Sequence, residues 1–111
     1  MTIYALSSGS GISGIAVVRV SGEETSKVIE LLTGKPVPKP KVATLRKINK
    51  INTSELIDEG IILWFPGPQS YTGEDMAEIQ VHGSKAVIDA IHTSISVIEL
   101  SLKFKLAYSL N

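Results

Sequence analysis

The chain has 111 residues, the length of a single domain, and its 11 basic and 11 acidic residues give a formal net charge of zero. A domain that grips nucleic acid by its phosphates usually carries a basic excess, so the composition does not favour nucleic acid as the direct ligand. The absence of cysteine excludes disulfides, thiolate catalysis and zinc–sulfur sites. No basic, apolar leader opens the chain, and no apolar run approaches the roughly 20 residues of a membrane span. We therefore expect a cytoplasmic domain that does not enter a membrane.

Two strands are predicted at the start of the chain, joined by a loop of serines and glycines. Residues 2–6 form a short β-prone run, and residues 14–20 (GIAVVRV) form an apolar run of strand length rich in β-branched side chains. With a period of two, Arg19 shares one face of the second strand with Ile15 and Val17. A charge on a mostly apolar face needs a partner.

A helix and an extended connector are predicted next. Ser21 and Glu24 have the spacing of a capping box, which predicts a helix from Ser21 to about Leu32, and Gly34 is its expected C-terminal glycine. Residues 35–41 (KPVPKPK) contain three prolines, which exclude a helix and favour an extended, polyproline-like connector on the surface.

The middle of the chain predicts three strands. Residues 43–51 suit an edge strand with protective lysines, residues 58–60 (DEG) indicate a turn or bulge, and residues 61–65 (IILWF) form an apolar strand. A rigid Pro-Gly-Pro turn at residues 66–68 and an acidic loop lead to an alternating strand over residues 76–82.

The last part predicts a helix over residues 84–100, whose apolar side chains recur at helical spacing, and a half-buried strand over residues 102–108. The order β-β-α-β-β-β-α-β predicts an α+β fold, in which a mostly antiparallel sheet carries two helices packed on one face.

Two phosphate-binding patterns fail in their context. Residues 9–14 match G-x-G-x-x-G, but a strand rather than the required helix follows them. Residues 33–36 resemble the end of a P-loop, but Pro36 replaces the hydroxyl that binds Mg²⁺. With a net charge of zero as well, we expect this chain to bind neither GTP nor RNA appreciably by itself.

Two charged side chains stand out as candidate ligand contacts. Glu78 lies in mid-strand, where Glu is disfavoured, and its carboxylate can accept two parallel hydrogen bonds from an N–H-rich heterocycle. Arg19 offers a rigid fork of donors to a carboxylate, to a carbonyl or to Glu78 itself. The alternative is that Arg19 and Glu78 form an internal salt bridge.

Other polar residues of this region have simpler interpretations. His82 lies about 13 Å along the strand from Glu78, too far to share one metal ion, and is expected to be a hydrogen-bonded residue at the strand end. Glu74 and Asp75 are either solvated loop charges or, for Thr72 and Asp75, a local cap.

Several blocks in the right order resemble the N-terminal domain of the TrmE/MnmE family of tRNA-modification GTPases. The resemblance covers nearly the whole chain, and its most specific part is the SYTGED block followed by Glu78 and His82-Gly83. The matching blocks are TIYA at residues 2–5, GIAVVRVSG at residues 14–22, DEG at residues 58–60 and WFPGPQSYTGED at residues 64–75.

The resemblance implies that residues 1–111 are a folate-binding domain related to those of aminomethyltransferases. It implies a homodimer that binds 5-formyl-tetrahydrofolate or a related tetrahydrofolate, with Arg19 and Glu78 contacting the cofactor. The full-length family protein adds a helical domain and a GTPase domain that uses GTP, Mg²⁺ and K⁺. With an FAD-containing partner of the MnmG/GidA type, it modifies the wobble uridine of certain tRNAs. Catalysis by residues 1–111 alone is not expected.

The chain departs from the family pattern at several positions. Ser8 and Ile12 replace the usual proline and basic residue of the glycine loop, and Ser84 replaces the second glycine of the usual HGG. The family continues into a P-G-E-F motif and a folate-contacting lysine, where this sequence ends at residues 108–111 (YSLN). We therefore expect a fragment with an incomplete folate site. This leaves the alternative of a purely structural dimerisation domain with a vestigial or incomplete site, and the small size disfavours an independent aminomethyltransferase.

Overall fold

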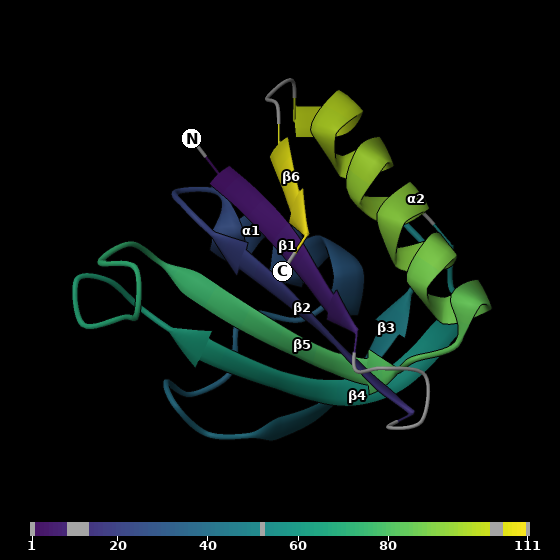
Figure 1. The fold of residues 1–111 in the computed structure, drawn as a ribbon, viewed down its shortest axis with the longest axis horizontal. Coiled ribbons are helices and arrows are strands. Elements are labelled where there is room, and N and C mark those ends of the chain that lie inside the picture. Colours follow the sequence, from purple (N-terminus) through teal and green to yellow (C-terminus); the bar gives the residue numbers. More distant parts are fainter. Residues whose placement is uncertain (1, 9–13, 52, 103–105, 111) are drawn as a thin grey trace.

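A single sheet organises the described part of the chain, which in this computed structural model comprises residues 2–8, 14–51, 53–102 and 106–110. The strands are β1 (Thr2–Ser8), β2 (Ile15–Ser21), β3 (Thr44–Asn49), β4 (Leu56–Phe65), β5 (Met76–His82) and β6 (Leu106–Leu110), and the helices are α1 (Thr25–Thr33) and α2 (Lys85–Leu102). Within these ranges the sheet has the order β3-β4-β5-β2-β1-β6 (Figure 1). The first five strands are antiparallel, and β6 runs parallel to β1.

One face of the sheet packs against both helices and forms the core. The alternation of β2 is typical, because Ala16, Val18 and Val20 are buried whereas Ile15 and Arg19 are exposed on the other face. The helices contribute Val28, Ile29 and Leu32 from α1 and Ile91, Ile95 and Ile98 from α2 to the same cluster. In Figure 1, α1 lies behind the strands. The opposite face of the sheet, which we call the open face, has no helix over it in the described residues.

The predicted α+β class, the order of the elements and the placement of two helices on one face are confirmed. The period-of-two assignment of Arg19 to the face opposite the buried side chains of β2 is also correct. Most of the glycine-rich run at residues 9–14 lies outside the described residues, but Gly14 leads directly into strand β2, as predicted.

The predicted start of the first helix is wrong. Ser21 is the last residue of β2, and α1 begins four residues later at Thr25, with Glu24 at the N-cap position and no side-chain cap. The Ser21 hydroxyl instead lies 2.8 Å from that of Thr72 on a distant loop. The backbone N–H of Glu24 donates to the Thr2 hydroxyl at 2.9 Å, so a tertiary contact replaces the local capping box.

The first helix ends at the predicted glycine, and the connector after it contains no helix, as its prolines predicted. Gly34 has φ +71°, a left-handed conformation that glycine adopts without strain, and its N–H donates to the Glu30 carbonyl at 2.7 Å. Residues 35–43 then contain no helix, and Pro40 forms an isolated parallel bridge with Trp64. The end of the connector thus lies beside β4. Strand β3 follows at the edge of the sheet, as the lysines of residues 43–51 predicted.

The turn predicted as one alternative for residues 58–60 is absent, because β4 is continuous through them, whereas an irregularity in pairing lies one residue before the segment. There, Ile48 of β3 pairs with Asp58 and Asn49 with Leu56, so Ile57 of β4 is an extra residue in the register. Gly60 has a packing role: a Cβ atom at this position would lie only 2.3 Å from the backbone oxygen of Gln80. The glycine therefore allows β4 and β5 to approach each other closely.

The C-terminal prediction is correct for the helix and shifted for the strand. Helix α2 extends to Leu102, where the predicted strand over residues 102–108 was expected to begin, and residues 103–105 lie outside the described residues. The strand that the structure describes is β6, paired with β1 in parallel. Neither described helix is long and apolar enough to cross a membrane.

Gly60→Ala should lower the free energy of unfolding by at least about 2 kcal/mol, because the added methyl group would collide with rigid backbone. Gly83→Ala is the matched control, since a Cβ atom there comes no closer than 3.4 Å to its neighbours. Urea denaturation of both variants measures the difference. Equal stability of the two variants would contradict the packing role of Gly60.

Candidate functional site

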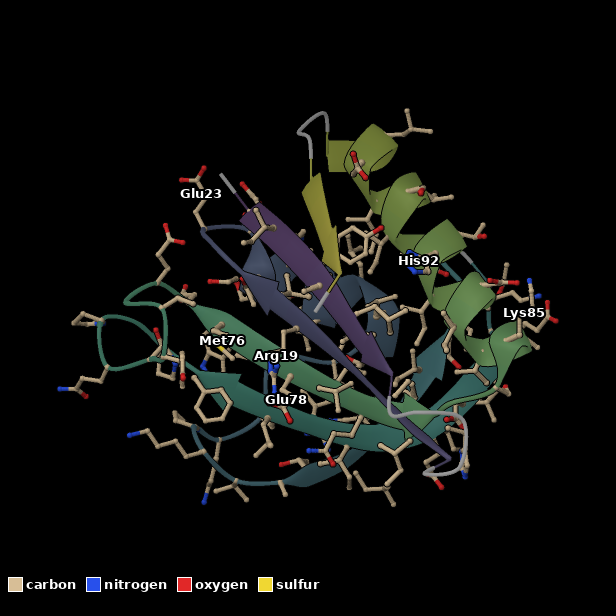
Figure 2. The ribbon with its side chains drawn as sticks, in the orientation of Figure 1. Arg19, Glu23, Met76, Glu78, Lys85 and His92 are labelled. Atoms are coloured by element: carbon tan, nitrogen blue, oxygen red, sulfur yellow. The ribbon has the colours of Figure 1, made fainter. Side chains whose placement is uncertain are left out.

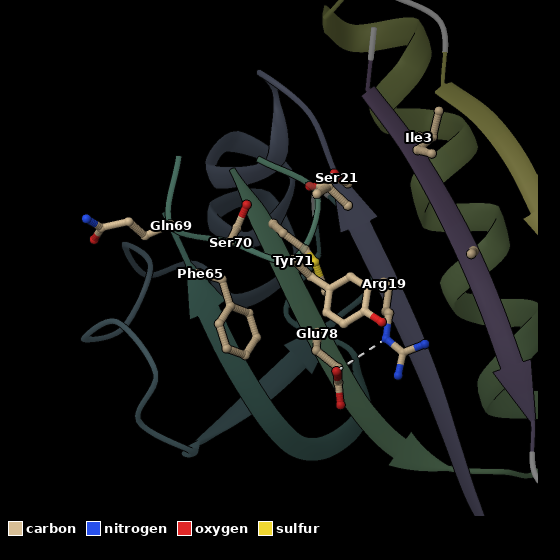
Figure 3. Close-up of a pocket in the computed structure, with 11 residues that line it drawn as sticks. Ile3, Arg19, Ser21, Phe65, Gln69, Ser70, Tyr71 and Glu78 are labelled. Atoms are coloured by element: carbon tan, nitrogen blue, oxygen red, sulfur yellow. Dashed lines mark hydrogen bonds and ion pairs between the residues drawn. The ribbon is translucent and has the colours of Figure 1, made fainter. Parts of the chain in front are cut away.

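The open face of the sheet carries a cavity of about 530 Å³. Strands β1, β2 and β5, the end of β4 and the loop between β4 and β5 form its walls (Figure 3). Its lining combines apolar side chains with a few polar ones: Ile3, Ala5, Phe65 and Met76; Arg19, Ser21 and Glu78; and residues 69–72 of the loop. A mostly apolar cavity with few polar groups is typical of small-molecule sites.

The two predicted site residues lie together in this cavity. Arg19 of β2 is directly opposite Glu78 of β5, and its Nε lies 3.3 Å from Glu78 Oε2. Gln80 donates to the other carboxylate oxygen of Glu78 at 3.0 Å. Figure 2 shows Arg19 and Glu78 next to each other over the strands. The predicted internal salt bridge is therefore present, and it lies inside the cavity.

This ion pair leaves hydrogen-bonding capacity on both partners. The Arg19 side chain is 45% exposed and contacts Glu78 through Nε, while its two terminal nitrogens extend beyond that contact in Figure 3. Each oxygen of the Glu78 carboxylate can accept a second hydrogen bond. The salt bridge and a ligand contact are thus compatible for both residues.

Hydrogen bonds hold the loop between β4 and β5 at its base. Asp75 accepts from the Gly67 N–H through Oδ1 at 3.0 Å and from the Gly22 N–H through its backbone oxygen at 2.8 Å. The Thr72 hydroxyl meets Ser21 rather than Asp75. Asp75 is therefore a structural loop residue, neither a solvated charge nor part of the suggested Thr72–Asp75 cap, whereas the side chain of Glu74 is exposed.

His82 forms the hydrogen bonds expected at a strand end, and its partner is Asp58 of β4. The His82 backbone N–H donates to Asp58 Oδ2 at 2.8 Å, and Nδ1 lies 3.0 Å from both carboxylate oxygens. Burial favours the neutral acid, but the hydrogen bonds from His82 and the Glu59 backbone outweigh it, so the pKa of Asp58 lies below its ordinary value. Sequence reasoning missed this role of Asp58.

The lining residues other than Arg19 and Glu78 were also missed, among them Ser21, Phe65 and Tyr71. The sequence predicts Ser21 as a helix cap, and it predicts Phe65 as part of an apolar strand without indicating which face of the sheet its side chain lies on. The available signal was the strand–turn–loop sequence around the Pro-Gly-Pro turn, which returns the chain to the strand it has just left. Loops held by a rigid scaffold often carry binding residues.

The fold and the site define an α+β domain with a cavity on the open face of its sheet. The family model described as GTP-binding protein TrmE N-terminus matches residues 2–108. The chain belongs to this family.

Similar proteins carry consistent names. The tRNA modification GTPase MnmE of Pelagibacter ubique (strain HTCC1062) is 78% identical over 99 residues, which cover 89% of this chain and 22% of that protein. The protein of the same name from Sinorhizobium medicae (strain WSM419) is 50% identical, covering 88% of this chain and 22% of that protein. The mitochondrial 5-taurinomethyluridine-[tRNA] synthase subunit GTPB3 of Danio rerio is 51% identical, covering 81% of this chain and 18% of that protein. The chain thus spans about a fifth of the length of these relatives.

Asp58→Asn should weaken the dependence of stability on acid pH. Because the pKa of Asp58 in the folded state lies below its ordinary value of 3.8, its ionised form stabilises the fold above about pH 5. That contribution is lost as the pH falls through the folded-state pKa. We expect the variant to lose about 1–2 kcal/mol at pH 7 and to show a shallower decline from pH 5 to pH 3.

Urea denaturation across this pH range tests the Asp58 prediction. Asp89→Asn is the control, since Asp89 pairs with Lys85 at the exposed surface, where solvent screens the pair and it contributes little to stability. An acid decline as steep in Asp58→Asn as in the unaltered chain would contradict the assignment.

Proposed function

We propose that this chain is the tetrahydrofolate-binding, homodimerising N-terminal domain of a tRNA modification GTPase. The observation that carries the proposal is the position of Arg19 and Glu78, together in one cavity, in a chain that belongs to the TrmE N-terminal family. The names of its relatives support the part that concerns tRNA modification.

The chemistry of the cavity fits a reduced folate. The pterin ring presents an edge of N–H donors, and the Glu78 carboxylate is a suitable acceptor for parallel hydrogen bonds. The terminal nitrogens of Arg19 can donate to a carbonyl or carboxylate of the same ligand. Ile3, Phe65 and Met76 supply apolar contact to the flat ring. The volume of about 530 Å³ lies within the usual range of small-molecule sites.

The cofactor of this proposal is 5-formyl-tetrahydrofolate or a related tetrahydrofolate, and the domain is related to the folate-binding domains of aminomethyltransferases. In the whole protein, GTP, Mg²⁺ and K⁺ bind in parts other than these residues. That protein acts in the cytoplasm with an FAD-containing partner of the MnmG/GidA type on the wobble uridine of certain tRNAs. These roles go beyond what the names of the relatives say, and this chain spans about a fifth of the length of those relatives.

The homodimer of this proposal forms through the open face. Apolar side chains on that face are exposed in the isolated chain, including Ile3 at 41%, Ile15 at 54% and Leu45 at 57%. The helices cover the other face, so a second copy of the chain is the partner that would remove these side chains from water.

A second function, a purely structural dimerisation domain, is favoured by one specific observation. Glu78 already receives hydrogen bonds or ion-pair contacts at both oxygens, from Arg19 and from Gln80. If those contacts were its whole role, the cavity would be a vestigial or incomplete folate site.

Glu78→Ala should weaken binding of 5-formyl-tetrahydrofolate by at least about tenfold, because the donors of the ring edge would be buried without an acceptor at about 1–3 kcal/mol. Glu74→Ala is the matched control: this exposed glutamate lies on the neighbouring loop but does not line the cavity. Calorimetric titration measures both affinities. Equal affinities for Glu78→Ala and the unaltered chain would favour the purely structural role.

The chain should sediment as a dimer of the 11.9 kDa protomer at micromolar concentration. Ile15→Lys should raise the dissociation constant of the dimer at least about tenfold, because it places a charge in the buried contact. Leu100→Lys is the control, since Leu100 is 80% exposed on α2, away from the open face. Sedimentation equilibrium that shows only protomers at high concentration would exclude the proposed homodimer.

A further inference from the structure

Tyr71 combines two properties that a surface loop residue rarely shows together. Its side chain is 95% exposed, so it contributes almost no apolar burial to the fold. It is nevertheless part of the cavity lining, and in the view of Figure 3 its ring reaches from the loop across the cavity, between Phe65 and Arg19. Single exposed apolar side chains are common on protein surfaces, but they do not usually overhang a cavity.

The backbone that carries Tyr71 is held in place. The adjacent Thr72 hydroxyl lies 2.8 Å from the hydroxyl of Ser21, which is buried at the end of β2. Asp75 closes the loop through the Gly67 N–H at 3.0 Å and ties it to Gly22 at 2.8 Å. Because these contacts order the loop backbone, ligand binding has to fix only the Tyr71 side chain and not the loop that carries it.

The side of the cavity beneath the loop is apolar at its centre and polar at one edge. Phe65 is fixed at the end of β4, paired with Met76 of β5, and both side chains line the cavity. The ion pair of Arg19 and Glu78 lies on the neighbouring part of the sheet. A flat ring that meets Glu78 with its edge therefore has one face towards the sheet and the other towards Tyr71.

We propose that Tyr71 is a specificity-determining residue that stacks on the outer face of a planar heterocycle bound in this cavity. The proposal rests on the proposed function, which supplies the planar pyrimidine ring of the reduced pterin as that heterocycle. The phenyl ring of Tyr71 makes the contact, and its hydroxyl is not required. Stacking of an aromatic side chain on a flat heterocycle selects for planarity, while Glu78 selects for donors at the ring edge.

The test is calorimetric titration of 5-formyl-tetrahydrofolate into the unaltered chain, Tyr71→Ala and Tyr71→Phe. Tyr71→Ala should weaken binding about tenfold, the range in which aromatic stacking on a base contributes to affinity. Tyr71→Phe should bind within about twofold of the unaltered chain, because it keeps the ring. Urea denaturation should show no loss of stability in either variant, since the Tyr71 side chain is almost entirely exposed.

A second titration uses para-aminobenzoyl-glutamate, which carries the tail of folate without the pterin ring. Tyr71→Ala should leave its affinity unchanged relative to the unaltered chain. Equal affinity of the unaltered chain and Tyr71→Ala for 5-formyl-tetrahydrofolate would overturn the stacking role alone. An equal loss in Tyr71→Phe would also overturn it, because the hydroxyl would then be the contact. Absence of binding by the unaltered chain would overturn the proposed function and the stacking role together.

Discussion

The division of each strand between a covered and an open face is the constraint on which the rest of this structure depends. In β2, alternate side chains enter the core beneath the helices, so Arg19 is forced to the opposite side. In β5 the same alternation buries Ala77 and Ile79 and sends Glu78 to the open face. The antiparallel register then places Arg19 directly opposite Glu78. A one-residue slip of either strand would exchange its faces and destroy both the core and the site.

In the acidic loop between β4 and β5, some residues hold the loop in place and others line the cavity. Asp75 is used for loop closure, since its side chain and backbone accept hydrogen bonds from Gly67 and Gly22. Thr72 joins the loop to β2 through Ser21. The residues of the motif with the strongest charges are therefore not the ones that line the cavity; the neutral Tyr71 and Thr72 are.

Local periodicity was sufficient to predict much of the fold. The apolar alternation of β2 and β5 and the helical stripe of α2 depend on neighbours within one element, and these elements were predicted correctly. The errors arose where a distant residue competes with a local one. Ser21 and Thr72 are 51 positions apart, so the capping box at Ser21 could not be rejected from local spacing.

The same reason limited prediction of the site. Arg19 and Glu78 could be identified because each conflicts with its own strand, by charge or by propensity. Phe65 and Tyr71 conflict with nothing nearby, and their place in the cavity follows only from the pairing of β4 with β5. Residues 58–60 were predicted as a turn or bulge, which gave no indication that Asp58 contacts His82 or that Gly60 packs closely against Gln80.

The ion pair between Arg19 and Glu78 does not oppose ligand binding as strongly as a buried pair would. Arg19 is nearly half exposed, at 45%, and such pairs typically contribute no more than about 1 kcal/mol. A ligand that adds hydrogen bonds to the free lone pairs of Glu78 keeps this contribution, and even one that displaces Arg19 forfeits little. The pair holds the carboxylate in position before a ligand arrives, which reduces the ordering cost of binding. The salt bridge is therefore compatible with the ligand contact proposed for these two residues.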